Sequence, residues 1–153
     1  MNCSMRNPER PWLIAIDTGG TFTDAVARTP TGEQRRTKVL SNGSIRARIV
    51  EILGPRRCRL DFHGLAIPEG LLTGFSLRSA ESSATPIVCD VNDGVLVFDT
   101  DVKASMGAVI ELKAPFDAPR LALHLLVGTL PGQSLPPIDL RVATTRGTNA
   151  LLE

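Results

Sequence analysis

Short apolar runs separated by turn residues occupy the first forty positions of the chain. Residues 12–16 form a run typical of a buried strand, and it stops at Gly19 and Gly20, a turn in which both glycines can adopt positive φ. Residues 21–27 are β-branched, aromatic and partly alternating, and residues 34–40 follow the turn residues 30–32. The pattern predicts a β-hairpin that continues into a meander of three strands.

The next segment has apolar residues at helical spacing. Ser44 is suited to the N-cap of a helix, and residues 54–55, Gly-Pro, are suited to ending one. Between them, apolar side chains recur at i, i+4, i+7 and i+8: Ile45, Ile49, Ile52 and Leu53. The sequence therefore predicts a helix over residues 45–53, which gives the order β-β-β-α.

From about residue 60 the apolar runs become shorter. Strand-like segments lie at 74–77, 86–91, 95–99 and 108–112, and Asn-Asp-Gly at 92–94 is a strong hairpin signal. Regular short strands with tight turns predict a small β-rich barrel or sandwich.

The remaining residues return to longer elements. Residues 117–119 open a short helix over 119–127 that Gly128 ends, and residues 140–144 form a strand. A further helix begins at 147–149 and still continues at Glu153, so we expect the chain to be the amino-terminal piece of a larger protein.

Composition narrows the class of protein. The chain has 153 residues, 42% hydrophobic and 22% charged, which is typical of a soluble globular domain and excludes a disordered polar chain. No stretch suits a membrane span and the N-terminus lacks the apolar core of a signal peptide, so we expect a cytoplasmic protein. The isolated Cys3, Cys58 and Cys89 indicate reduced thiols rather than a disulfide framework or zinc site, and His124 lies among leucines as a packed side chain.

Positive charge is concentrated in residues 35–59. Glu51 is the one acidic residue there, against arginines and Lys38 throughout the segment. Aromatic residues do not interleave with these cations and no nucleic-acid-binding motif is present, so a solvated face or a contact with a partner domain is favoured over nucleic acid.

The candidate chemistry lies in residues 17–24, Asp-Thr-Gly-Gly-Thr-Phe-Thr-Asp. A strand ends in Asp17, a glycine turn exposes backbone N–H groups, and hydroxyls and Asp24 follow. N–H groups and threonine hydroxyls suit phosphoryl oxygens, and a carboxylate at a strand end can hold Mg²⁺ through water. The segment is neither a P-loop nor a dinucleotide-binding fingerprint. The alternative is a plain hairpin turn with structural threonines.

Residues 17–24 resemble the first phosphate motif of the actin-like, sugar-kinase and heat-shock-chaperone ATPases. They are most similar to that of the hydantoinase A and 5-oxoprolinase family. Lys-Val-Leu-Ser at 38–41 and Thr-Thr-Arg-Gly-Thr-Asn-Ala-Leu-Leu-Glu at 144–153 are similar to two further segments of that family, in the same order. Ala143, Arg146 and Gly147 depart from its usual residues, and these departures concern the substrate more than the fold.

The resemblance implies an α/β (α+β) fold. Residues 1–59 would be the N-terminal part of an actin-like (ribonuclease H-like) ATPase subdomain, and residues 119–153 the return to it. Residues 60–118 would be inserted between them as the β-rich barrel or sandwich that their short strands predict. The insertion is not part of the family's common pattern.

The resemblance also implies an ATP-dependent hydrolase of cyclic amides such as 5-oxoproline or a hydantoin. ATP would phosphorylate the amide oxygen, water would add to the activated carbon, and the ring would open. The implied cofactors are ATP and Mg²⁺. The implied partners are a small cyclic amide, the rest of the same polypeptide and a hydantoinase B-like subunit or domain, with no nucleic acid and no membrane. The isolated chain is expected to be inactive.

The residue roles implied by the resemblance fall into three groups. Asp17 and Asp24 would be catalytic, with Asp17 holding Mg²⁺ through water. The phosphate-binding residues would be Gly19, Gly20, Thr21 and Thr23. The substrate-side candidates are Thr144, Thr145, Thr148 and Asn149. The alternatives are a non-catalytic nucleotide-binding module, an ATP-dependent ketone carboxylase, or a kinase of the same superfamily.

Overall fold

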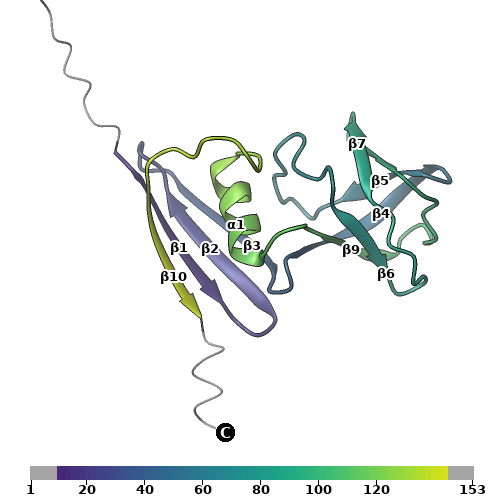
Figure 1. Cartoon of the computed structure of the whole chain (residues 1–153), viewed down its shortest axis with the longest axis horizontal. Helices are drawn as coiled ribbons and strands as arrows, with labels where there is room; N and C mark the ends of the chain where they lie inside the picture. The colour runs from purple at the N-terminus through teal and green to yellow at the C-terminus, as the bar shows by residue number, and fades with distance from the viewer. Residues whose placement is uncertain (1–9, 145–153) are drawn as a thin grey trace, which may run out of the picture.

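The computed structural model describes residues 10–144 and is mostly strands, with one helix in that range (Figure 1). The first group of elements is β1 (Trp12–Thr18), β2 (Phe22–Arg28), β3 (Gln34–Leu40), α1 (Ala118–Val127) and β10 (Ile138–Thr144). The second group is β4 (Ser44–Gly54), β5 (Arg57–Asp61), β6 (Ser76–Ser79), β7 (Val88–Asn92), β8 (Val95–Phe98) and β9 (Val109–Lys113). The protein is therefore a mixed α/β fold dominated by strands, as predicted. Within residues 10–144 no helix has the length and apolar character that a membrane span requires.

The first group is a four-stranded sheet covered on one face by α1. Its strand order is β10-β1-β2-β3, with β10 parallel to β1 and the other pairs antiparallel. Alternate positions such as Ile14, Ile16 and Ala25 are buried and α1 packs on β1, β2 and β3, whereas the positions between them are exposed. The alternation read from the sequence follows from this one-sided burial.

The helix α1 begins and ends where its capping residues predict. The Asp117 side chain accepts a hydrogen bond from the Arg120 N–H at 2.9 Å, and Gly128 ends the helix with a φ of 79°. The buried leucines and alanines of α1 face the sheet, so the helix is held by an apolar stripe.

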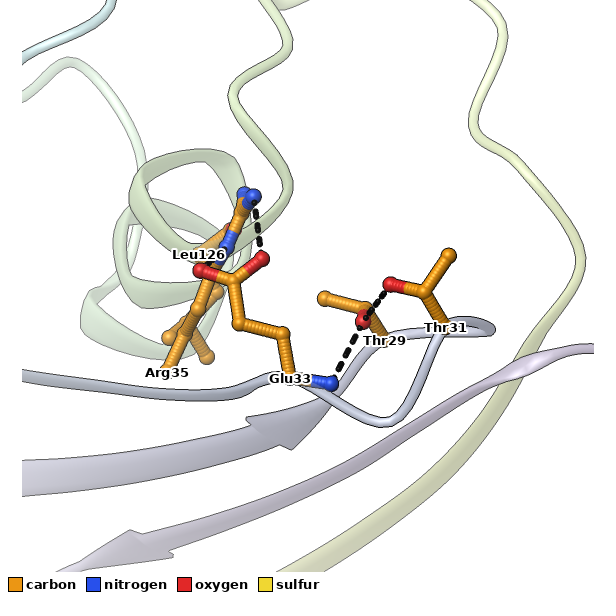
Figure 2. A network of polar contacts seen from close by, with 5 residues as sticks. All are labelled: Thr29, Thr31, Glu33, Arg35 and Leu126. Carbon is orange, nitrogen blue, oxygen red and sulfur yellow. Dashed lines mark hydrogen bonds and ion pairs between the residues drawn. The ribbon is translucent and has the colours of Figure 1, made fainter.

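The end of α1 is also tied to β3 by a polar network (Figure 2). The Arg35 guanidinium forms a two-contact ion pair with Glu33, donates to the Leu126 carbonyl at 3.2 Å and lies 5.2 Å from the centroid of the Trp12 ring. In the adjoining turn, the Thr29 hydroxyl accepts from the Glu33 N–H and lies 2.9 Å from the Thr31 hydroxyl. The β2–β3 turn is thereby closed by its own side chains.

The helix predicted over residues 45–53 is wrong, because the segment is the strand β4. Ile45, Ala47 and Ile49 are buried while Arg46 and Arg48 are exposed, so the segment also alternates with a period of two. A spacing of four places residues on one face of a strand as well as of a helix, and β4 has strand partners on both sides, β5 and β9. The pairing with β5 skips Val50, which shifts the alternation and sets Ile52 opposite the buried Cys58, although Ile52 itself is exposed. Ser44 is a fully buried strand residue rather than a helix cap.

The strands after β4 agree with the predicted β-rich texture. Asp93 and Gly94, with φ of 49° and 75°, form the tight turn between β7 and β8 that the Asn-Asp-Gly sequence predicts. Strands β5 to β9 pair with one another and with β4, and none of them pairs with β1, β2 or β3. The two groups meet at one backbone pairing, Leu40 with Ser44.

Candidate functional site

Ser41, the last residue of the Lys-Val-Leu-Ser segment, forms hydrogen bonds with both sides of the β1–β2 turn. The Gly19 N–H donates to the Phe22 carbonyl at 2.9 Å, and the Ser41 N–H donates to the Thr21 carbonyl at the same distance. The Ser41 hydroxyl donates to the Gly19 carbonyl at 2.8 Å and lies 3.1 Å from the Thr23 hydroxyl. Ser41 thus fixes both sides of the turn. From the sequence, Ser41 is recognisable only as the last residue of the Lys-Val-Leu-Ser segment, because its contact with the turn at Gly19 joins residues distant in sequence.

The turn itself exposes backbone donors. In the described part of the chain, the amide N–H groups of Gly20 and Thr21 have no hydrogen-bond acceptor, and both residues are exposed. Gly20 does not take the left-handed conformation that the sequence allows for it, and a Cβ built on it would meet no atom within 4 Å. The backbone of Gly20 is therefore open to close approach by a ligand.

Asp17 and Asp24 lie opposite each other on neighbouring strands, both exposed on the sheet face that α1 does not cover. Like charges directly opposite repel, and the repulsion is partly offset by Lys38, whose Nζ lies 3.5 Å from Asp24 and 4.7 Å from the centroid of the Phe22 ring. Two carboxylates beside an exposed turn are a donor set that suits Mg²⁺, which usually keeps several waters. Among residues 10–144 no group of three or more metal-ligating side chains occurs.

The predicted phosphate-binding residues do not all lie on one surface. Thr23 is fully buried on the α1 side of the sheet, where its hydroxyl contacts Ser41. The Gly19 N–H is engaged within the turn. The structure therefore brings Asp17, Asp24, Gly20 and Thr21 to the exposed end of the hairpin, and places Thr23 beneath it.

The second motif begins next to this hairpin. Because β10 runs parallel to β1, their carboxyl ends lie at the same sheet edge, and Thr144 is the register partner of Thr18. The other substrate-side candidates, Thr145, Thr148 and Asn149, lie outside the described residues.

The side chain of His124 is packed in the interior, and the described cysteines are free thiols. His124 is 5% exposed, its Nδ1 lies 3.2 Å from the Thr129 hydroxyl, and burial lowers the pKa of its imidazole. The thiols of Cys58 and Cys89 are free, and burial raises the pKa of Cys58 to about 11. Cys3 lies outside the described residues.

Comparison with known proteins places the first part of the chain in a family. No solved structure matches the chain. Residues 13–59 match the family model described as the hydantoinase/oxoprolinase N-terminal region. The matched segment contains all of the β1–β2 hairpin except Trp12, both exposed carboxylates and Ser41. This match agrees with the resemblance predicted from the hairpin and the Lys-Val-Leu-Ser segment, and it concerns residues 13–59.

Proposed function

We propose that this chain supplies the phosphate-binding hairpin of an ATP-dependent cyclic-amide hydrolase of the 5-oxoprolinase or hydantoinase type. The observation that carries the proposal is the pair of exposed amide donors, Gly20 and Thr21, at the tip of a hairpin within the family-matched segment. The carboxylates of Asp17 and Asp24 lie on the strands that lead into this tip.

We infer that the first group of elements is the beginning of an actin-like (ribonuclease H-like) ATPase subdomain. Three antiparallel strands, a helix on one face and a fourth strand parallel to the first support this inference. The division at 1–59, 60–118 and 119–153 stays a proposal, although β4 falls within 1–59 and pairs with β5 and with β9 of the inserted segment.

The residue roles follow from where each group lies. Asp17, with Asp24 beside it, would hold Mg²⁺ through water, and the amide N–H groups of Gly20 and Thr21 would donate to phosphoryl oxygens. Bound Mg²⁺ would neutralise the charge of the transferring phosphoryl group. Because the Thr23 hydroxyl is buried against Ser41, we assign Thr23 to support of the turn rather than to phosphate contact.

The chemistry to be catalysed is the activation of a poor electrophile. The amide oxygen attacks the γ-phosphorus of ATP and ADP leaves, so the former carbonyl oxygen becomes a phosphate ester. Water then adds to the carbon and the ring C–N bond breaks, and a second water releases inorganic phosphate. Fixing the triphosphate at a preformed hairpin supplies positioning, which accounts for much of phosphoryl-transfer catalysis.

A substitution at Gly20 tests this proposal without disturbing the fold. Gly20→Ala adds a methyl group into open space at a position that is not left-handed, so the midpoint of unfolding should not change. The same methyl group would lie where phosphate approaches, so Mg-ATP affinity measured by NMR titration should fall about tenfold. Mg-ATP affinity equal to that of the unsubstituted chain would contradict the proposal.

Gly32→Ala is the matched control, since Gly32 lies in the other hairpin with a φ of 91°. It should destabilise the fold by about 1–2 kcal/mol and leave nucleotide affinity unchanged.

A further inference from the structure

A pocket of about 480 Å³ opens directly beside the candidate phosphate hairpin. It lies along the outer edge of β3, which pairs with β4 only at Leu40 in the described region, and is closed on the far side by residues 62–65 after β5. Phe22 and Asp24 of the hairpin strand β2 line its near end. A molecule in this pocket would therefore lie next to the place proposed for the triphosphate.

The pocket wall carries more positive than negative charge. Arg36, Lys38 and Arg46 line it, against the single carboxylate of Asp24. Lys38 is paired with Asp24, and Arg46 Nε lies 3.5 Å from Glu111. Arg36 is different, since within residues 10–144 it has neither an ion pair nor a hydrogen bond through its side chain. The guanidinium of Arg36 is thus available for an anion from outside the chain.

The rest of the wall is apolar and partly aromatic. Side chains of this kind come from both sides of the pocket: Phe22, Leu40, Ile45, Phe62 and Leu65. Flat aromatic and branched side chains around a few polar groups are typical of sites for small organic ligands, which use the polar groups to fix orientation. A pocket with apolar walls and one unpaired guanidinium suits a small ring bearing one negative charge.

We infer that this pocket holds the substrate and that Arg36 determines its specificity by binding a carboxylate on the ring, an inference that rests on the proposed function. Arg36 selects carboxylate-bearing cyclic amides, such as 5-oxoproline, over uncharged rings such as unsubstituted hydantoin. The planar guanidinium binds a carboxylate through two parallel hydrogen bonds, whereas an uncharged ring leaves it without a counter-ion. From Arg36, β3 runs toward the hairpin, where Leu40 lies opposite Phe22, so the pocket extends from Arg36 to the hairpin side, where the amide end of the ring would lie.

The test is an NMR titration of the 153-residue chain with two matched ligands. One is 5-oxoproline and the other is 2-pyrrolidinone, which has the same ring and amide but no carboxylate. We expect 5-oxoproline to shift amide signals of residues 36–38 and 62–65 and to bind at least about tenfold more tightly than 2-pyrrolidinone. Arg36→Gln should remove this preference.

Arg28→Gln is the control variant, because Arg28 is also an exposed arginine of the same sheet without an ion pair in the described region, and it does not line this pocket. It should bind both ligands as the unsubstituted chain does. Equal affinity for the two rings, no shift at residues 36–38 up to about 10 mM 5-oxoproline, or a preference retained in Arg36→Gln would overturn the inference.

Two further arms separate this inference from the proposed function. If acetate displaces 5-oxoproline at equal concentration, the pocket recognises any small carboxylate and substrate specificity is overturned. Mg-ATP is titrated separately: 5-oxoproline binding that depends on Arg36 without any Mg-ATP binding contradicts the nucleotide proposal and supports the pocket. Mg-ATP binding without 5-oxoproline binding supports the nucleotide proposal and contradicts the inference about the pocket.

Discussion

The two hairpins at opposite ends of β2 differ in how their polar groups are used. In the β2–β3 turn, the N–H groups of Thr29, Gly32 and Glu33 all donate within the turn, and the Thr29 hydroxyl accepts one of these bonds (Figure 2). In the β1–β2 turn, the N–H groups of Gly20 and Thr21 have no acceptor in the described chain, although Ser41 holds the carbonyl side firmly. In the described chain the β2–β3 turn, called the closed turn below, leaves only the Thr31 N–H without an acceptor, whereas the β1–β2 turn leaves two adjacent N–H groups open at its tip.

The difference indicates where a ligand belongs in this sheet. An exposed N–H without a protein acceptor is solvated by water, and an anion can replace that water at little structural cost. Because Ser41 holds the β1–β2 turn, its N–H donors keep a fixed geometry, and the turn has to reorganise less when an anion binds. The open turn is therefore suited to phosphate, whereas the closed turn serves the packing of α1.

The largest expected effect is the loss of turnover on substitution of Asp17. Under the proposed function, Asp17→Asn should lower ATP-dependent turnover by about 10²-fold or more, because an amide is a far weaker ligand than a carboxylate for Mg²⁺. The backbone of Asp17 is held by the strands on both sides, so the fold should be unchanged. Steady-state kinetics with varied Mg²⁺ measures the effect.

Asp139→Asn is the control, because Asp139 is an exposed aspartate of the neighbouring strand β10, away from the hairpin. It should retain normal turnover. If Asp17→Asn also retains normal turnover with the same Mg²⁺ dependence, the hairpin is only a structural turn.

A smaller effect is expected on removing the hydroxyl group that supports each turn, Ser41 for the β1–β2 turn and Thr29 for the β2–β3 turn. Ser41→Ala removes the bond to the Gly19 carbonyl, so Mg-ATP affinity should fall about tenfold and the free energy of unfolding should fall by about 1 kcal/mol. Thr29→Ala should lower the free energy of unfolding by about 1 kcal/mol, because it removes the part-buried hydrogen bond that the Glu33 N–H donates to the Thr29 hydroxyl, but should not change nucleotide affinity. Urea unfolding and NMR titration of both variants measure the two quantities. Equal loss of nucleotide affinity in both variants would remove the distinction between the turns.

A pH effect is expected from the helix that covers the closed turn. Burial lowers the pKa of His124 in the folded chain, so the unfolded chain binds a proton more readily. The free energy of unfolding should therefore decrease as the pH falls below about 6.5, the ordinary pKa of histidine, and level off below the folded pKa. The His124→Gln variant should lose this component of the pH dependence. An identical pH profile in the variant would show that other groups cause it.

The smallest effect is expected from the exposed ion pair of Lys38 with Asp24, both more than half exposed. Lys38→Met should change the free energy of unfolding by less than about 1 kcal/mol, because solvent screens such pairs. Thermal unfolding measured by circular dichroism is sufficient to check it. A larger loss would indicate that Lys38 offsets the repulsion between Asp17 and Asp24 more than its exposure suggests.

Much of the fold near the hairpin could be predicted from the sequence. The strands β1 to β3 alternate cleanly because α1 buries only one face, and Asp117, Pro119 and Gly128 mark the helix ends. β4 could not be predicted in the same way, since Ile45 and Ile49 satisfy both periods and the deciding factor is pairing with β5 and β9, which are distant in sequence.

Near the candidate site, the sequence predicts the β1–β2 hairpin but not how its side chains are arranged. The letters of residues 17–24 identify the hairpin, yet they do not reveal that Thr23 lies beneath the turn and contacts Ser41. Nor does the sequence place Arg36 beside residues 62–65, because that proximity depends on how β3 and β5 are brought together. Both arrangements depend on the direction of side chains and on contacts between residues distant in sequence, which the local sequence pattern does not show.

An NMR titration of the ¹⁵N-labelled chain with Mg-ATP tests the difference between the two turns most directly. We expect the amide signals of Gly20 and Thr21 to move with increasing Mg-ATP, while those of Gly32 and Glu33 in the closed turn stay in place. Signals of Gly20 and Thr21 that do not move, or that move no more than those of Gly32 and Glu33, would contradict it.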